Sequence, residues 1–428
     1  MPNPAAKRSR MLPIIVGNLF EWFDFTIYGF FATTIARQFF PPGDEEAGIL
    51  AVAATFGVAF VMRPVGAVVF GLIGDGWGRK TSLTLTFVLM GIGTAMVGLA
   101  PTYATAGFIA PVILVVGRLL QGFSASGEVG SSLTMLIEAT PPQRRGVAFA
   151  WFNVGVYSAV VFGSLAALAI NTLLSAGDAA AWGWRLPFLF GLVVAPIGFY
   201  LRYRVDESQE YLATRHSTPA ASPTESARQT LRGIAAVIGL AGFVSPVVYL
   251  ILIFMPGFAV RELGLEQRVP MLSTLISSLL LVALMVPMGH LSERVGGRRL
   301  IVLASAAGTV LVMPLMWYLT TAPSFASLLL LQCSLCACLA MYLPGCGPIV
   351  ADLFPVARRA LGIGLGYNLG VIAFGAFAPF ITAWLIHATG NKMTTAWYVF
   401  AGGAISVLVA LTLPDTKPRR ADVIADHP

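Results

Sequence analysis

Long runs of apolar residues, separated by short polar stretches, dominate the pattern of this chain. The run from Thr81 to Gly117, for example, contains no Asp, Glu, Lys or Arg, and it is long enough for two helices joined by a turn. A helix that crosses a membrane needs about 20 predominantly apolar residues. Because backbone groups in lipid must be hydrogen-bonded within the protein, we predict that these runs are transmembrane helices.

Hydropathy and the positions of polar punctuation together predict twelve transmembrane spans. We place them at residues 11–36, 47–74, 82–100, 105–136, 146–173, 185–203, 233–259, 271–291, 300–319, 325–350, 360–387 and 394–413. The predicted fold is therefore an all-α membrane protein. We expect the lipid bilayer to surround these spans.

Composition supports this interpretation. Of the 428 residues, 57% are hydrophobic and 11% are charged, and the mean hydropathy is +0.80. Soluble domains carry about 25% charged residues. The net charge of +7 reflects basic residues in short loops, where Lys and Arg mark the cytoplasmic side. Placing the N-terminus inside puts most of the 27 Lys and Arg in cytoplasmic loops, so both termini are predicted to be cytoplasmic. Nucleic acid is not an expected partner, because no basic soluble domain is present.

The twelve spans divide into two halves. The polar stretch 204–232 is predicted to be a cytoplasmic connector between a six-helix bundle at 1–203 and a second bundle at 233–413, with a cytoplasmic tail at 414–428. Two loops match across the halves: Gly71 to Lys80 corresponds to Gly289 to Arg299, and Glu138 to Gly146 corresponds to Asp352 to Gly362. Secondary transporters are often built from such repeats, with the substrate site between them near the membrane midplane.

These loops resemble the signature of the major facilitator superfamily, and Arg118-Leu-Leu-Gln121-Gly122 is similar to its fourth-helix motif. More narrowly, Gly17 to Phe25, Arg63 to Gly66, Trp182 to Phe188 and Gly366 to Gly370 resemble motifs of the metabolite:proton symporter family. The resemblance implies alternating access, with the two loops acting as a conformational gate. It also implies a bacterial inner membrane as the location. The residues that it implies for the gate are Asp75, Arg79, Lys80, Glu138, Arg145, Glu293, Arg298, Asp352 and Arg359, and we add Glu128 because it lies toward the cytoplasmic end of its span. These loop charges could instead serve only to set topology.

Four ionisable residues lie near the middle of predicted spans. Glu21 and Asp24 are three residues apart and share a helix face, whereas Arg63 and Arg118 are on the second and fourth spans. A charge inside a membrane costs several kcal/mol, so it is usually kept for pairing or for function. One interpretation is that these charges neutralise one another and lock the helices together. The other is that the arginines bind an anionic substrate and that Glu21 or Asp24 carries a coupled proton, since capture of an arginine by substrate would change the proton affinity of the acid.

Polar side chains on other spans extend the candidate substrate site. Together with the two arginines, the predicted substrate-binding residues are Tyr28, Gln121, Asn153, Tyr157, Tyr249, Tyr367 and Asn368. Hydrogen bonds between helices would explain these polar residues equally well. The same alternatives apply to Gln332 and Tyr342.

Other chemistries lack their motifs. Gly74 to Thr81 is Gly-rich, but it lacks the Gly-Lys-Ser/Thr ending of a phosphate-binding loop, so ATP is not expected to drive transport. The four cysteines, all between Cys333 and Cys346, have no partner ligands in their apolar segment, and helix packing explains them better than a metal. No hydrolase motif is present. We therefore expect no enzymatic activity and no cofactor. The family resemblance implies the proton as coupling ion, and we expect a monomer as the working unit.

The predicted function is proton-coupled symport of a small organic anion. Two buried arginines favour an acid with more than one carboxylate, and the family resemblance implies citrate, tricarballylate or α-ketoglutarate. Symport of a zwitterionic osmolyte such as proline or betaine is the first alternative, in which Glu21 or Asp24 would meet the cation. A nutrient sensor built on the same fold, which would bind its ligand without accumulating it, is the second.

Overall fold

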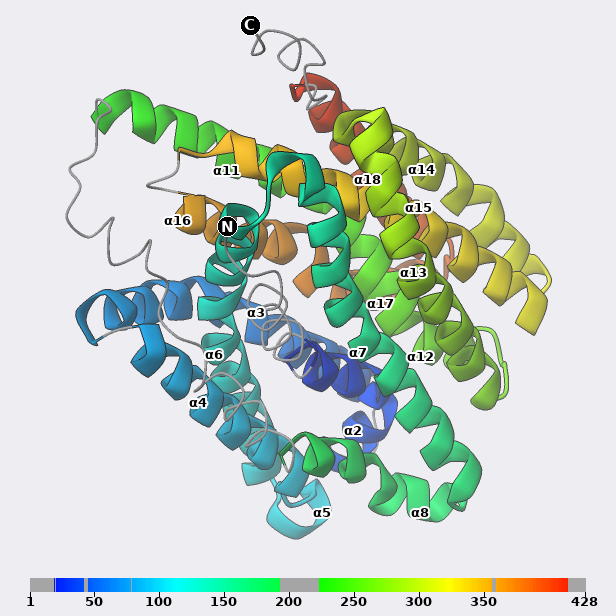
Figure 1. The fold of residues 1–428 in the computed structure, drawn as a ribbon. Helices are drawn as coiled ribbons and strands as arrows, with labels where there is room; N and C mark the ends of the chain where they lie inside the picture. Colours follow the sequence, from blue (N-terminus) through cyan, green and yellow to red (C-terminus); the bar gives the residue numbers. More distant parts are fainter. Residues whose placement is uncertain are drawn as a thin grey trace, which may run out of the picture.

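The computed structural model describes residues 19, 21–41, 45–77, 79–192, 223–355 and 359–414, and within these ranges its elements are helices joined by short loops (Figure 1). In the first half, residues 21–30 form a helix that α2 (Ala32–Phe39) continues after Phe31. The elements that follow are α3 (Glu45–Trp77), α4 (Arg79–Leu99), α5 (Tyr103–Ala106), α6 (Ile109–Ala139), η1 (Pro142–Arg144), α7 (Arg145–Leu173), α8 (Ala176–Ala181), η2 (Gly183–Arg185) and a helical segment at 186–192.

The second half contains two segments of π-helix, in which hydrogen bonds join residues five apart. In chain order its elements are α11 (Pro223–Pro246), the π-helix η3 (Val247–Phe254), α12 (Met255–Arg261), α13 (Arg268–Val295), α14 (Gly297–Thr321), α15 (Phe325–Leu353), α16 (Arg359–Val371), the π-helix η5 (Ile372–Ala376), α17 (Ala378–Thr389) and α18 (Thr394–Thr412). A π-helical turn inside an α-helix is rare and is frequent at functional sites.

The helices match the predicted spans closely. Within the described ranges, nine helices are long and apolar enough to cross a membrane, and Thr84–Leu99 in α4 is a shorter apolar stretch. The predicted first and sixth spans, 11–36 and 185–203, lie partly outside the described residues. The largest difference is at the seventh span, where α11 begins at Pro223 within the predicted connector. The structure does not describe the N-terminal residues 1–18, residues 193–222 or the tail beyond residue 414. The limits of the two bundles and the cytoplasmic location of the termini therefore stay predictions.

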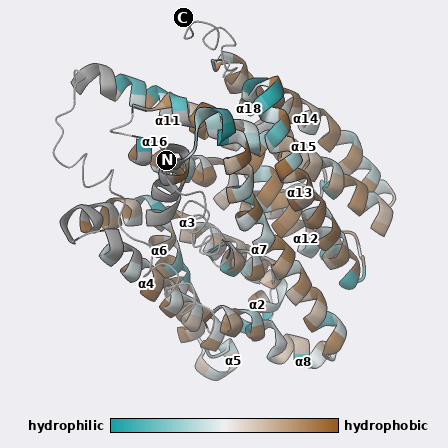
Figure 2. Ribbon diagram, viewed as in Figure 1, coloured by the Kyte–Doolittle hydropathy of each residue, from teal (hydrophilic) through white to brown (hydrophobic). Residues whose placement is uncertain are grey.

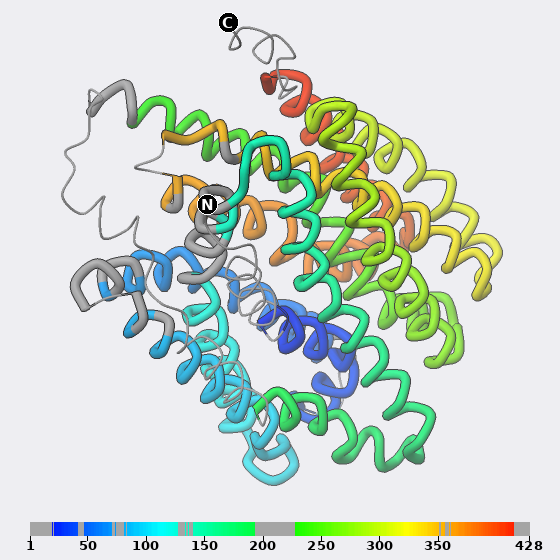
Figure 3. Tube along the Cα trace, viewed as in Figure 1, coloured from blue at the N-terminus to red at the C-terminus, as the bar shows by residue number. Residues whose placement is uncertain are grey.

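The two halves form two helix groups with a long interface. Figures 1 and 3 show α2 to α6, in blue to cyan, on one side and α13, α14, α15 and α18 on the other, with α7 running beside α13. Figure 2 shows brown, hydrophobic stretches along most of these helices. On α3 the exposed residues Val61, Val65 and Val68 share one face, as expected for a helix against lipid tails.

Close packing between α3 and α6 brings the two buried arginines together. A Cβ atom on Gly122 would collide with the backbone carbonyl of Ala59, and one on Gly66 would collide with the carbonyl of Phe123. Glycines at such positions let two helix backbones approach more closely than side chains allow, as is common in membranes. The crossing therefore places Arg63 of α3 and Arg118 of α6 in the same layer of the first bundle.

Candidate functional site

The first part of the site is a buried ion pair between Arg63 and Glu21. Arg63 Nη2 lies 3.4 Å from Glu21 Oε1, and the two side chains are 1% and 5% exposed. Arg63 is on the face of α3 that also carries Phe56 and Phe60, because these positions are separated by one and two helical turns. The helix thus turns Arg63 into the protein while its valines face outward.

The second part is a chain of hydrogen bonds between Arg118 and Asp24. Arg118 Nη1 donates to Gln121 Oε1 at 2.8 Å, and Gln121 Nε2 donates to Thr94 Oγ1 at 3.1 Å. The Thr94 hydroxyl donates in turn to Asp24 Oδ2, which Gln121 Nε2 also approaches at 3.5 Å. A Cβ atom on Gly191 would lie 3.0 Å from Asp24 Oδ1, so a glycine at this position leaves room for the carboxylate. Asp24 is therefore linked to Arg118 through two neutral side chains.

Aromatic rings surround both guanidinium groups. Phe25 lies between them, with its ring centroid 4.8 Å from Arg63 Cζ and 4.6 Å from Arg118 Cζ. The ring of Phe60 is 4.5 Å from Arg63 Cζ, and the ring of Tyr28 is 4.2 Å from Arg118 Cζ. Cations are attracted to the faces of aromatic rings, most strongly where water is excluded. The rings hold both arginines in place while leaving hydrogen-bonding capacity unused.

Unused donors remain on both arginines. Within the described part of the chain, Arg63 Nε and Nη1 and Arg118 Nε and Nη2 are buried and have no hydrogen-bond partner. A buried donor without a partner costs about 1–3 kcal/mol. Tyr367, from the second half, lies within hydrogen-bonding reach of Arg63, and Tyr249 of the same half is also close to it. Neutral hydroxyl groups of the other bundle are therefore close to the ion pair.

A cavity of about 130 Å³ lies between the two halves. Its walls come from the first-span helix, α6, α7, α11, η3, α15 and α16, and they are mainly apolar. The polar or aromatic residues among the lining residues are Trp22, Phe149, Phe152, Asn153, Tyr157, Ser245, Tyr249, Tyr342 and Tyr367. The arginines are not part of the lining. The structure places the four charged residues as a cluster beside this cavity, and none of them lines it.

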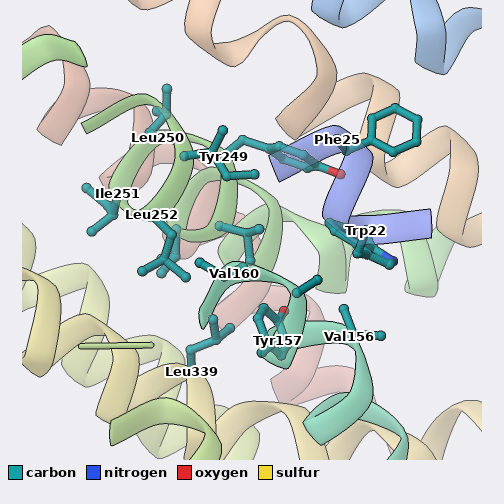
Figure 4. Packing of buried hydrophobic residues seen from close by; sticks show 14 of the residues in the cluster. Trp22, Phe25, Val156, Tyr157, Val160, Tyr249, Leu250, Ile251, Leu252 and Leu339 are labelled. Atoms are coloured by element: carbon teal, nitrogen blue, oxygen red, sulfur yellow. The ribbon is translucent and has the colours of Figure 1, made fainter. Parts of the chain in front are cut away.

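Aromatic contacts separate the cavity from the charge cluster. Trp22 and Tyr249 line the cavity and stack with their centroids 6.2 Å apart, and Figure 4 shows Tyr249 extending toward the segment that carries Trp22 and Phe25. Tyr249 also packs against Phe60, with their centroids 5.4 Å apart, and Phe60 covers Arg63. A ligand in the cavity is therefore separated from Arg63 by side chains rather than by backbone.

The other predicted binding residues are divided between the cavity and the helix interiors. Asn153 and Tyr157 both line the cavity from α7, although Asn153 Nδ2 also donates to the carbonyl of Phe149 at 2.8 Å. Asn368 is buried outside the lining, and its Nδ2 donates to the carbonyl of Gly364 at 2.9 Å. Tyr28 bonds to Thr55 beside Arg118. Sequence reasoning did not single out Thr94 or Thr55, because nothing distinguishes a threonine in an apolar span from other threonines until its neighbours are known.

Two predicted gate residues of the second half contact the first half. Asp352 Oδ1 at the end of α15 lies 3.4 Å from Arg145 Nη1 at the start of α7. Glu293 Oε1 on α13 accepts the backbone N–H of Val147 at 3.0 Å. Val147 is in the first turn of α7, where N–H groups lack partners in the helix and the helix dipole favours negative charge. These contacts hold the two halves together at the end where α7 begins.

The remaining gate predictions have different placements. Arg298 Nη2 donates at 2.5 Å to the carbonyl of Leu411, at the end of α18 within its own half. Arg359 begins α16 and is half-buried. The side chains of Asp75, Arg79, Lys80, Glu128 and Glu138 lie outside the description, so their gating roles stay predictions.

No group of three or more potential metal ligands occurs among the residues that the structure describes. Of the cysteines, Cys336, Cys338 and Cys346 are buried and free, as packing residues would be. Gln332 and Tyr342 both make hydrogen bonds between helices: Gln332 reaches α13 and η3, and Tyr342 donates to the carbonyl of Leu240 at 2.9 Å. For these two residues the structural alternative accounts for the contacts observed.

Comparisons with known proteins cover nearly the whole chain. The family model described as sugar (and other) transporter matches residues 11–230, and the model of the major facilitator superfamily matches residues 240–427. A citrate-proton symporter from Klebsiella pneumoniae is 33% identical over 397 residues, which are 92% of this chain and 89% of that protein. A proline/betaine transporter from Escherichia coli (strain K12) is 30% identical over 421 residues, or 94% of this chain and 83% of that protein.

A solved structure shows the same fold. The proton:xylose symporter XylE bound to 6-bromo-6-deoxy-D-glucose superposes with a TM-score of 0.76 at 18% identity, and the match covers 97% of each chain. The twelve-helix arrangement predicted from hydropathy is thus confirmed as a fold class. From the matched family models, the relatives and the charged cluster beside an inter-bundle cavity, it follows that this chain belongs to the major facilitator superfamily, as a proton-coupled, multi-pass bacterial inner-membrane member of its metabolite:proton symporter family.

Proposed function

We propose that this symporter carries a small organic acid with two or three carboxylates, such as citrate, tricarballylate or α-ketoglutarate, by alternating access. The observation that carries the proposal is the pair of fully buried arginines with unused N–H donors, Arg63 and Arg118. A guanidinium presents parallel N–H groups that match the two oxygens of a carboxylate. A substrate carboxylate would therefore satisfy donors that the described protein atoms leave without partners.

Glu21 and Asp24 would then have different roles. Glu21 already neutralises Arg63, so a substrate carboxylate that binds Arg63 competes with it. Asp24 receives its hydrogen bonds from Thr94 and Gln121, and no ion pair to it is found among the described residues. A carboxylate with neutral partners loses less by protonation than one in an ion pair. We propose Asp24 as the proton carrier, connected to Arg118 through Gln121.

Contacts between the halves at both ends of the cavity support alternating access. At one end, a Cβ atom on Gly29 would collide with Ile253, and one on Gly57 would lie 2.6 Å from the ring of Phe377. At the other end, the halves meet through the pair of Arg145 and Asp352. Rocking of two repeats about a central site requires contacts at one end to break while those at the other hold.

A zwitterionic osmolyte is the second candidate, and the cavity wall favours it. Trp22, Tyr157, Tyr249 and Tyr367 all line the cavity. Aromatic rings bind quaternary ammonium groups well, and the carboxylate of betaine would still need an arginine. Both candidates therefore use the same arginines and differ in what the aromatic wall contacts.

Uptake by the purified protein in liposomes tests the proposal. With the outside made acidic, we expect labelled citrate or tricarballylate to accumulate, and a protonophore or equal pH on both sides to abolish the accumulation. Liposomes without protein are the control. Accumulation of glycine betaine in place of the acids would move the function to the second candidate. Uptake of either substrate that ignores the pH gradient would contradict proton coupling.

A further inference from the structure

The helix that carries Tyr249 lacks one of its own hydrogen-bond donors. In a π-helix such as η3, the carbonyl of a residue bonds to the N–H five residues later. For Ile251 that residue is Pro256, which has no N–H. The π-helical pattern ends just before this proline, which lies in the first turn of α12, where a missing N–H is tolerated. The carbonyl of Ile251 is therefore left without its donor inside the fully buried part of the second bundle.

Gln332 supplies the missing donor from another helix. Its Nε2 on α15 donates to the carbonyl of Ile251 at 2.9 Å and to Thr274 Oγ1 at 2.8 Å. Its Oε1 accepts from Ser273 Oγ at 2.5 Å. Both N–H groups and the oxygen of the amide are used, so one fully buried side chain links α13, α15 and η3.

Tyr249 is on η3, two residues before Ile251, and its ring is packed tightly between η5 and α3. On one side a Cβ atom on Gly375 of η5 would collide with its ring. On the other side the ring packs against Phe56 and Phe60, at centroid distances of 5.7 and 5.4 Å. The Tyr249 hydroxyl is buried without a partner among the described residues, and the side chain lines the cavity. A change in the winding of η3 would move this ring relative to both the cavity and Arg63.

We propose that Gln332 is a positioning residue for substrate binding: by donating to the carbonyl that Pro256 leaves unbonded, it fixes the π-helical form of η3 and thereby the place of Tyr249 between the cavity and Arg63. The inference rests on the proposed function, because it requires a substrate that occupies the cavity and reaches the arginines. Gln332 itself contacts neither the cavity nor the charge cluster; it acts through Tyr249.

The test measures KM and maximal rate of uptake for the same substrate in liposomes. Gln332→Leu removes the donor, and we expect the KM to rise about tenfold while the maximal rate per reconstituted protein changes by less than about twofold. Pro256→Ala added to this variant restores a backbone N–H five residues from Ile251. It should return the KM to within about threefold of the wild type. A role in packing alone gives no reason for this rescue.

Ser305→Ala is the matched control. Ser305 Oγ donates to the carbonyl of Ile301 at 2.6 Å, and both residues are on α14. The change therefore removes a buried hydrogen bond of the second half that does not involve η3. We expect it to leave the KM unaltered. If Gln332→Leu does not reach the membrane, Ser273→Ala frees one end of the amide and should raise the KM to a smaller extent, again reversed by Pro256→Ala.

The positioning role would be overturned if Gln332→Leu had the KM of the wild type, or if adding Pro256→Ala left the KM of Gln332→Leu unchanged. Where Ser273→Ala is used in place of Gln332→Leu, a wild-type KM or a lack of rescue by Pro256→Ala would overturn it equally. These KM values can be measured only if the wild-type protein takes up substrate. Failure of the proposed function is a different result, in which the wild type takes up neither the acids nor the zwitterions.

Discussion

Replacing Arg118 with methionine is expected to lower the initial rate of substrate uptake by more than about a hundredfold. Methionine keeps an unbranched apolar side chain between Phe25 and Tyr28 but removes the fork that would bind a carboxylate. It also removes the donor to Gln121 Oε1, and with it the connection to Asp24. Uptake of the labelled acid into liposomes, normalised to reconstituted protein, measures the effect.

The same change at Arg63 should have a similar effect, and an exposed arginine provides the control. Arg268 pairs with Glu266 at 3.8 Å on the surface, so Arg268→Met should change uptake by less than about twofold. Arg118→Lys keeps the positive charge without the planar fork and should recover only part of the rate. If both buried arginines tolerate methionine at full rate, they serve only to hold helices together, and the anion-binding interpretation fails.

Changing Asp24 to asparagine is expected to separate substrate movement from proton movement. Asparagine keeps the size of the side chain and can still accept from Thr94, but it cannot gain or lose a proton. Accumulation driven by a pH gradient should fall to the level of equilibration, a loss of more than about tenfold, while exchange of labelled for unlabelled substrate continues. Counterflow in liposomes without a pH gradient measures the exchange.

Glu21→Gln distinguishes the two acids. Because Glu21 pairs with Arg63, its neutralisation should alter the KM and leave pH-driven accumulation in place. If instead Asp24→Asn accumulates substrate normally and Glu21→Gln does not, the two roles are exchanged and Glu21 carries the proton.

The fold was largely predictable because lipid imposes a simple rule on sequence. Uncharged runs of about 20 residues become helices, and α14, α15 and α18 begin and end within three residues of the predicted limits. The start of α11 was not predictable by this rule, since Pro223 to Arg232 is polar and a helix that extends beyond the bilayer needs no apolar run. Its proline sits at the first helical residue, where it is tolerated.

The candidate site was predictable in its charges but not in its connections. Glu21, Asp24, Arg63 and Arg118 stand out because charge is costly in a membrane, and the structure places them in one cluster. Their partners are ordinary residues of apolar helices, such as Thr94 and Phe25, whose positions depend on how α3, α4 and α6 pack. The carbonyl of Ile251 belongs to the backbone, so no polar side chain marks it in the sequence. Pro256, five residues later, does indicate that a donor is missing.

Experiments can distinguish the two interpretations of the buried charges, which either lock the helices together or bind an anion and a proton. The pair of Arg63 and Glu21 has the geometry expected for locking helices. The remaining donors on both arginines, and the two neutral links between Arg118 and Asp24, are what a binding site for an anion and a proton requires.

Whether the buried arginines bind the substrate is decided by a structure of the protein with substrate bound. We predict a substrate carboxylate within hydrogen-bonding distance of Arg63 or Arg118, with Tyr249 displaced from its contact with Phe60 and the distance between Arg63 and Glu21 lengthened. A substrate held entirely by the cavity wall, with both arginines still enclosed by Phe25, Phe60 and Tyr28 and the ion pair intact, would contradict it.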